Sequence, residues 1–241
     1  MQKPMRPART GRRIVTIFIL FLLFCTFAIY EINHNSSKVV GMLAGPESPS
    51  ATSSVDDKQT GKYKIVIDPG HGGHDPGAPT ISGLEEKAYT LALAQEVYDQ
   101  LKQDPMFDPY LTRSDDTFVS LDDRAKFSND LEADAFISIH GNTYDDPEVS
   151  GTETYYYSDS SIQLADVIHE HILAANGFKD RGVRYNDLKV LRLNEVPAIL
   201  TEVGYLSNAS DEALLLDHDG QAHIAQGIID GLEDYFGGQA P

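Results

Sequence analysis

The chain has 241 residues and a formal net charge of −18 at pH 7. The first 60 residues hold 7 of the 19 Lys and Arg and 4 of the 37 Asp and Glu, which leaves 12 basic against 33 acidic residues beyond them. So acidic a region is not suited to binding nucleic acid or an anionic lipid surface. Cys25 is the single cysteine, which excludes an intrachain disulfide and a cysteine-based metal site.

The N-terminus has the pattern of a membrane-directing segment. Five basic residues (Lys3, Arg6, Arg9, Arg12 and Arg13) precede a mostly apolar run at residues 14–30. Seventeen helical residues extend about 25 Å, the short end of what crosses a bilayer. We therefore predict that residues 1–13 are cytoplasmic and that residues 14–30 are a transmembrane anchor or a cleaved signal sequence, with the anchor favoured. Either alternative places the remaining chain outside the cytoplasm.

Residues 31–62 are rich in Ser, Asn, Gly, Pro and Asp and contain few large apolar side chains. Such a composition predicts a flexible tether. Residues 63–237 then alternate short apolar runs with amphipathic stretches, which is typical of βαβ units. We predict one α/β catalytic domain whose mainly parallel, twisted sheet is flanked by helices.

The predicted elements follow from hydrophobic periodicity and from turn residues. The predicted strands are residues 63–68, 109–112, 135–140, 152–157, 189–193 and 198–202. The predicted helices are residues 87–103, 121–131, 162–175, 211–216 and 223–236. Ser120 with Asp123 predicts a helix N-cap, and Gly177 stands where a helix C-cap favours glycine.

Two histidines follow buried strands. His71 comes after an apolar run that ends at Asp68, in a turn rich in glycine, and His140 ends the run at residues 135–140. Parallel strands deliver catalytic groups to the edge of a sheet at their carboxyl ends. A glutamate at the start of the next helix, Glu85 or Glu86, could complete a ligand set, and the spacing alone does not choose between them.

Glu202 ends another apolar run, where an ionised carboxylate needs a cation or a hydrogen-bond donor to offset its desolvation. Two histidines and a glutamate form a catalytic zinc set, and a further glutamate can act as the general base for the attacking water. The sequence therefore predicts a metal-dependent hydrolase. We also expect Asn142 and the loop glycines Gly72 and Gly73 to hold the substrate.

The segments around these residues resemble those of the zinc-dependent N-acetylmuramoyl-L-alanine amidases, the type 3 family of bacterial cell-wall hydrolases. The resemblance covers residues 64–236 and includes residues 65–73, 83–87, 111–115, 118–124, 137–142, 181–183, 190–192 and 199–208. It implies a phosphorylase/hydrolase-like fold and one Zn²⁺ per domain. It also implies that the metal ligands are His71, Glu86 and His140, and that the catalytic glutamate is Glu202.

The same resemblance implies that zinc-activated water cleaves the amide between N-acetylmuramic acid and L-alanine in peptidoglycan. Two other functions remain as alternatives: a zinc peptidase or carboxypeptidase, and a catalytically silent, membrane-tethered wall-binding regulator. We expect peptidoglycan as substrate, the bacterial membrane as a contact of the N-terminal segment, and no nucleic-acid partner. A monomer is favoured, either anchored at the outer face of the membrane or secreted to the wall.

Overall fold

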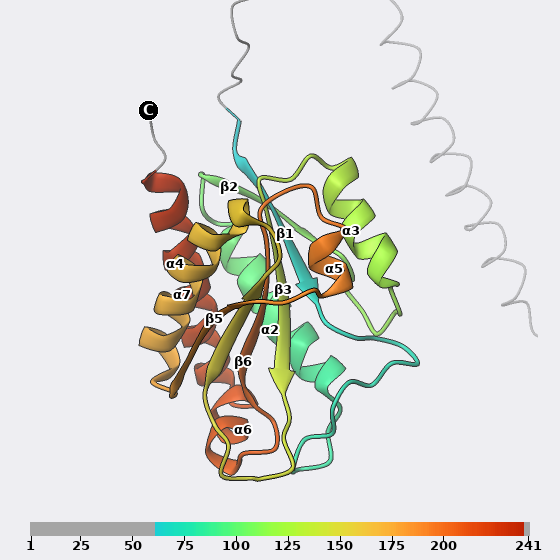
Figure 1. Ribbon diagram of the computed structural model, residues 1–241, viewed down its shortest axis with the longest axis vertical. Coiled ribbons are helices and arrows are strands. Elements are labelled where there is room, and N and C mark those ends of the chain that lie inside the picture. Colours follow the sequence, from blue (N-terminus) through green and yellow to red (C-terminus); the bar gives the residue numbers. More distant parts are fainter. Residues whose placement is uncertain (1–60, 239–241) are drawn as a thin grey trace, which may run out of the picture. The chain divides into compact units, whose positions relative to one another are not determined.

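The structure, a computed structural model, describes residues 61–238. Its core is one six-stranded sheet with the strand order β2-β1-β3-β6-β4-β5 (Figure 1). The strands are β1 (Tyr63–Pro69), β2 (Phe107–Leu111), β3 (Ala135–Asn142), β4 (Thr152–Tyr156), β5 (Asp180–Tyr185) and β6 (Ala198–Tyr205). β1, β2, β3 and β6 run parallel, while β4 is antiparallel to β6 and parallel to β5. The predicted α/β domain with a mainly parallel sheet is confirmed.

Helices cover both faces of the sheet, as Figure 1 shows. The helices are α2 (Glu86–Leu101), α3 (Leu121–Asp130), α4 (Ile162–Asn176), α5 (Lys189–Arg192), α6 (Ala209–Leu215) and α7 (His218–Gly237), and residues Asp159–Ser161 form one 3₁₀ turn. The larger apolar core joins one sheet face to α2, α4 and α7, whereas α5 packs on a smaller cluster on the opposite face. With both faces covered, the buried positions of the central strands are mainly apolar, as in parallel strands of such sheets, with polar exceptions such as Asp68, Ser138 and Thr201.

Local capping signals act as predicted. The Ser120 side chain accepts a hydrogen bond from the backbone N–H of Asp123 at the start of α3. Gly177 ends α4 in the left-handed conformation, with φ = 67°. These two caps explain why both predicted helices begin or end within one or two residues of the observed bounds.

One predicted strand is wrong, and one observed strand was not predicted. Residues 189–193 were expected to be a strand, but Lys189–Arg192 form the short helix α5. Val190 and Leu191 are neighbours in sequence, and both are buried because a single helical turn lays them on the same apolar cluster. The unpredicted strand is β5, an exposed edge strand made of charged residues around Gly182 and Val183, so it lacks the apolar signature of a buried strand.

Predictions about the N-terminal 60 residues, namely the cytoplasmic segment, the anchor or signal, and the tether up to residue 60, lie outside the described residues. Within residues 61–238, no helix is both long and apolar enough to cross a membrane.

A buried ion pair fixes the carboxyl end of β1. Arg124 of α3 donates to Asp68 Oδ1 at 2.6 Å, and also donates to the carbonyl oxygens of Pro69 and His71. Asp68 additionally accepts hydrogen bonds from Thr112 and Ser138. One guanidinium therefore holds three successive parts of the turn that leads into His71.

We expect Arg124→Ala to lower the free energy of unfolding by about 3–5 kcal/mol, because it leaves the buried Asp68 carboxylate without its counter-ion. Denaturant unfolding of the full chain measures this difference. Lys126→Ala is the matched control on the same helix, where an exposed pair with Asp130 should contribute less than about 1 kcal/mol. Equal effects of the two substitutions would contradict the role given to Arg124.

Candidate active site

Three potential metal ligands meet at the carboxyl ends of β1 and β3. The ligand atoms of His71, Glu86 and His140 all lie within 4.8 Å of one another. His71 Nε2 is 3.1 Å from Glu86 Oε2, and His140 Nδ1 is 3.0 Å from Glu86 Oε1. His71 follows β1, His140 lies near the carboxyl end of β3, and Glu86 opens α2.

Glu86, and not Glu85, belongs to this cluster. Glu85 is exposed and forms an ion pair with Lys87. Glu86 is buried, and backbone N–H groups of Ala78 and Gly141 donate to its two oxygens at 2.8 and 3.1 Å. Burial alone would raise the pKa of Glu86, but the hydrogen bonds with His140 and His71 hold it well below its usual range. Glu86 is therefore kept as an anion facing two imidazoles.

Two glycines make this close approach possible. A Cβ at Gly70 would lie 2.3 Å from the His140 ring. At Gly77, where φ is +69°, a Cβ would lie 2.6 Å from the Glu86 side chain and 2.7 Å from the His71 ring. The glycine-rich sequence after β1 is therefore needed for space at the cluster as well as for chain reversal.

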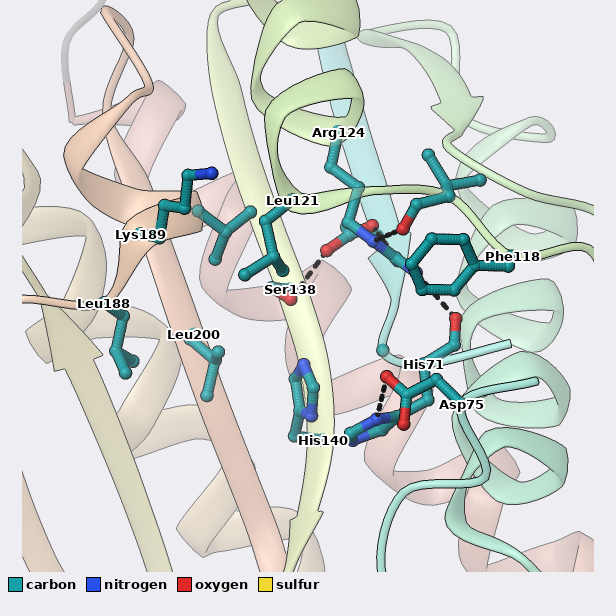
Figure 2. A pocket seen from close by; sticks show the side chains of 14 residues that line it. His71, Asp75, Phe118, Leu121, Arg124, Ser138, His140, Leu188, Lys189 and Leu200 are labelled. Atoms are coloured by element: carbon teal, nitrogen blue, oxygen red, sulfur yellow. Dashed lines mark hydrogen bonds and ion pairs between the residues drawn. The ribbon is translucent and has the colours of Figure 1, made fainter. Parts of the chain in front are cut away.

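Asp75 orients His71. Its Oδ2 lies 2.9 Å from His71 Nδ1 (Figure 2). The other ring nitrogen, Nε2, is thereby directed at Glu86. Although burial alone would lower the pKa of His71, the contacts with Glu86 and Asp75 raise it. A carboxylate on the far nitrogen of a metal-ligating histidine commonly fixes the ring and its tautomer. This role of Asp75 was not predicted, because its only signal in the sequence is an acidic residue four positions after His71.

Glu202 lies beside the cluster on the neighbouring strand. It is in register with His140 across the parallel pair β3–β6, so the two side chains point to the same face of the sheet. Part of the residue is accessible, yet its Oε2 atom is buried and has no hydrogen-bond partner in the described part of the chain. Burial raises the pKa of Glu202 to about 7. A carboxyl with this proton affinity can both accept and return a proton near neutral pH.

A second carboxylate, Glu153, stands directly opposite Glu202 on the antiparallel neighbour β4. Unlike Glu202, it is fully supplied with donors, from Tyr155, Tyr205 and Arg181. Glu153 was not predicted as a site residue from the sequence. The only indication of Glu153 in the sequence is that an acidic residue interrupts a run of threonines and tyrosines at residues 152–157.

A cavity of about 380 Å³ adjoins the cluster. Figure 2 shows the rings of His71 and His140 at one end of it. Leu121 of α3, Leu188 and Val190 at α5, and Leu200 of β6 give the other end an apolar lining. The site is therefore open to a ligand on the sheet face that α3 and α5 flank.

The three residues expected to hold the substrate do not line this cavity. Asn142 ends β3, and its side chain accepts from the N–H of Thr143. Gly72 packs against the Thr117 carbonyl, and the Gly73 N–H donates to Asp116. Gly72 also exchanges backbone hydrogen bonds with Asp75, and the Gly73 carbonyl accepts from Lys87. The substrate role of all three residues stays a prediction.

The donor set suits a divalent metal ion. Two imidazole nitrogens and one carboxylate form an N/O set of the kind found in catalytic zinc sites, with a position left for water or substrate. The buried Glu202 Oε2, which has no hydrogen-bond partner among the described residues, is also suited to a nearby cation or to a water molecule. The residues present therefore fit a metal ion.

Comparison with known proteins identifies the family. Residues 65–234 match the family described as N-acetylmuramoyl-L-alanine amidase. The chain belongs to this amidase family. Over 211 residues it is 35% identical to the probable cell wall amidase LytH of Staphylococcus aureus, an alignment that covers 86% of this chain and 70% of that protein.

Two solved amidases share the fold. The catalytic domain of CwlV, an N-acetylmuramoyl-L-alanine amidase from Bacillus (Paenibacillus) polymyxa var. colistinus, is 46% identical, with a TM-score of 0.71 over 73% of this chain and 98% of that one. The amidase AmiC2 of Nostoc punctiforme is 40% identical, with a TM-score of 0.71 over 74% of this chain and 99% of that one. The predicted family and the predicted peptidoglycan amidase activity are confirmed.

We expect Asp75→Asn to weaken binding of a divalent metal by about 10- to 100-fold, because the amide no longer fixes His71 with Nε2 toward the cluster. Competition with a chromogenic zinc chelator measures the affinity. The matched control is Asp234→Asn on α7, which alters a similar Asp–His contact with His171 of α4 and should leave the zinc affinity unchanged. If both variants bind zinc as the wild type does, Asp75 does not position His71.

Proposed function

We propose that this amidase is zinc-dependent, that His71, Glu86 and His140 hold one Zn²⁺, and that Glu202 is the general base. The observation that carries this proposal is an N/O ligand set beside Glu202, whose buried Oε2 has no hydrogen-bond partner within residues 61–238. When bound, such an ion polarises the scissile carbonyl and lowers the pKa of water toward about 7. The family of the chain supports the muramoyl–alanine amide as the bond cleaved, and the described site has no feature specific to a peptidase.

Glu202 has the properties that the proton transfers require. Its pKa of about 7 lets the carboxylate take the proton of the attacking water and then return it to the leaving amine of L-alanine. Its position in register with His140 puts it one strand spacing, about 4.8 Å, from a proposed ligand. Asp75 and the buried hydrogen bonds of Glu86 keep the ligand side chains in place while this happens.

The proposal extends to where the enzyme acts. The similarity to a cell wall amidase supports action on peptidoglycan outside the cytoplasm. We propose that residues 1–13 stay cytoplasmic, that residues 14–30 anchor or export the chain, and that residues 31–62 tether the domain near the wall. This placement rests on the charge and composition of those residues. We also propose that the enzyme is a monomer, with Asn142, Gly72 and Gly73 as further substrate contacts.

Digestion of purified peptidoglycan, with mass analysis of the products, tests the chemistry. The wild-type chain should release peptides that begin with L-alanine, a chelator should stop the release, and added Zn²⁺ should restore it. Glu202→Gln should keep the fold and the metal but lose about 100-fold or more of the turnover, because an amide cannot accept the water proton. Cleavage within the stem peptide would indicate a peptidase, and near-normal turnover of Glu202→Gln would exclude it as the base.

A further inference from the structure

The edge strand β5 places two arginines near Glu202. Arg184 is in register with Tyr155 of β4, which is itself in register with Leu200 of β6. Directly paired residues point to the same face of a sheet, so Arg184 lies on the face that carries Leu200 and Glu202. Arg181 reaches the same face, because its Nε donates to Glu153, the residue opposite Glu202.

Arg181 forms an ion pair with the buried carboxylate of Glu153. Glu153 accepts hydrogen bonds from Arg181 at 2.5 Å, from the Tyr205 hydroxyl at 2.6 Å and from the Tyr155 hydroxyl. Although burial alone would raise the pKa of Glu153, these donors lower it, so the group is ionised. The Arg181 guanidinium also lies 5.2 Å from the centre of the Tyr205 ring. Arg181 and Glu153 therefore neutralise each other in a fixed arrangement.

Arg184 does not form a close ion pair of this kind with Glu153. One of its terminal nitrogens donates to the Arg181 carbonyl at 2.6 Å, and the other is 3.9 Å from Glu153, beyond hydrogen-bond distance. Its side chain is 53% exposed. Glu153 already has three donors, so the group of Arg181, Arg184 and Glu153 carries one surplus positive charge. This surplus lies at the catalytic face of a region that is otherwise strongly acidic.

The proposed role of Glu202 determines which part of the substrate passes over β4 and β5. The carboxyl that returns a proton to the leaving amine must lie next to that nitrogen. The peptide that starts at this nitrogen is therefore on the side of Glu202 and the strands beyond it. β5 is two strand spacings, about 10 Å, from β6. A substituent on the second residue of the peptide is roughly 4–7 Å from the scissile nitrogen, so the long Arg184 side chain can meet it.

We propose that Arg184 binds a carboxylate on the residue that follows L-alanine in the leaving peptide, and so determines specificity for an anionic stem. The proposal rests on the function assigned to Glu202 above. A guanidinium with free N–H groups matches a carboxylate in shape and charge. The alternative role for Arg184 is to protect the sheet edge, since an unpaired charge on an edge strand discourages pairing with other strands. If that is its role, Arg184 has no effect on the choice of substrate.

Two synthetic muramoyl peptides test the proposal. In both, L-alanine is followed by D-glutamate whose γ-carboxyl is capped as an amide; one carries a free α-carboxylate and the other an α-carboxamide. For the wild-type chain we expect kcat/KM to be about tenfold or more higher with the carboxylate, the size expected of a charge-assisted hydrogen bond. Arg184→Gln should reduce this ratio to about one, mainly by slowing the carboxylate substrate.

Arg192→Gln is the matched control. It makes the same substitution at an exposed arginine of α5, which is paired with Asp187. This variant should retain the wild-type ratio of kcat/KM for the two peptides. Binding of both peptides to Glu202→Gln, whose turnover is slowed about 100-fold or more, gives a readout of binding, and the same preference should appear in the dissociation constants. It should disappear in the double variant with Arg184→Gln.

Equal kcat/KM of the wild type for the two peptides would overturn the proposal, as would a ratio that Arg184→Gln leaves unchanged. These outcomes differ from failure of the proposed function. In that case the wild type would release L-alanine peptides from neither substrate, or Glu202→Gln would turn over both at nearly the wild-type rate.

Discussion

The Glu86 carboxylate is the contact on which the rest of the site depends. Its two oxygens face His140 and His71, and each oxygen also accepts a backbone N–H, from Gly141 and Ala78. These partners belong to the turn after β1, the loop before α2 and the end of β3. One side chain thus joins three separate segments and requires glycine at positions 70 and 77, where a Cβ would collide with the cluster.

The carboxyl groups near the site differ in how many hydrogen bonds they accept, and this number separates structural carboxylates from the proposed general base. Asp68 and Glu153 are buried, and each accepts several hydrogen bonds, including one from an arginine, as expected of carboxylates that hold structure. In Glu202 one buried oxygen has no donor in the part of the chain that the structure describes, and burial raises the pKa of this residue to about 7. Because perturbed groups of this kind concentrate at functional sites, Glu202 is the carboxyl best suited to proton transfer.

Site residues whose position follows from their neighbours in the sequence could be predicted. His71, His140 and Glu202 each follow an apolar run, and parallel strands bring such positions to one edge of the sheet. Spacing could not separate Glu86 from Glu85; the resemblance chose Glu86, and in the structure only Glu86 turns inward. The roles of Asp75 and Glu153 depend on which nitrogen faces the cluster and on which strand lies alongside β6. Both are tertiary facts that a single sequence does not contain.

The same distinction applies to the secondary structure. The central strands and long helices have strong periodicity and were predicted, although α7 begins five residues before its predicted start and β6 continues three residues beyond its predicted end. The edge strand β5 is mostly exposed and charged, so its pairing with β4 depends on backbone hydrogen bonds that leave little trace in composition. The error at α5 has a related cause, because two adjacent buried residues fit a strand or one helical turn equally well.

Metal content of paired glutamate variants tests the central claim most directly. Glu86→Gln and Glu85→Gln make the same change at neighbouring positions, one inside the cluster and one exposed. After equilibration with Zn²⁺ and removal of free metal, the wild-type chain and Glu85→Gln should each retain about one zinc per chain. Glu86→Gln should retain far less while keeping its fold. Equal zinc content in the two variants would contradict the account, because Glu86 would then not be needed to assemble the site.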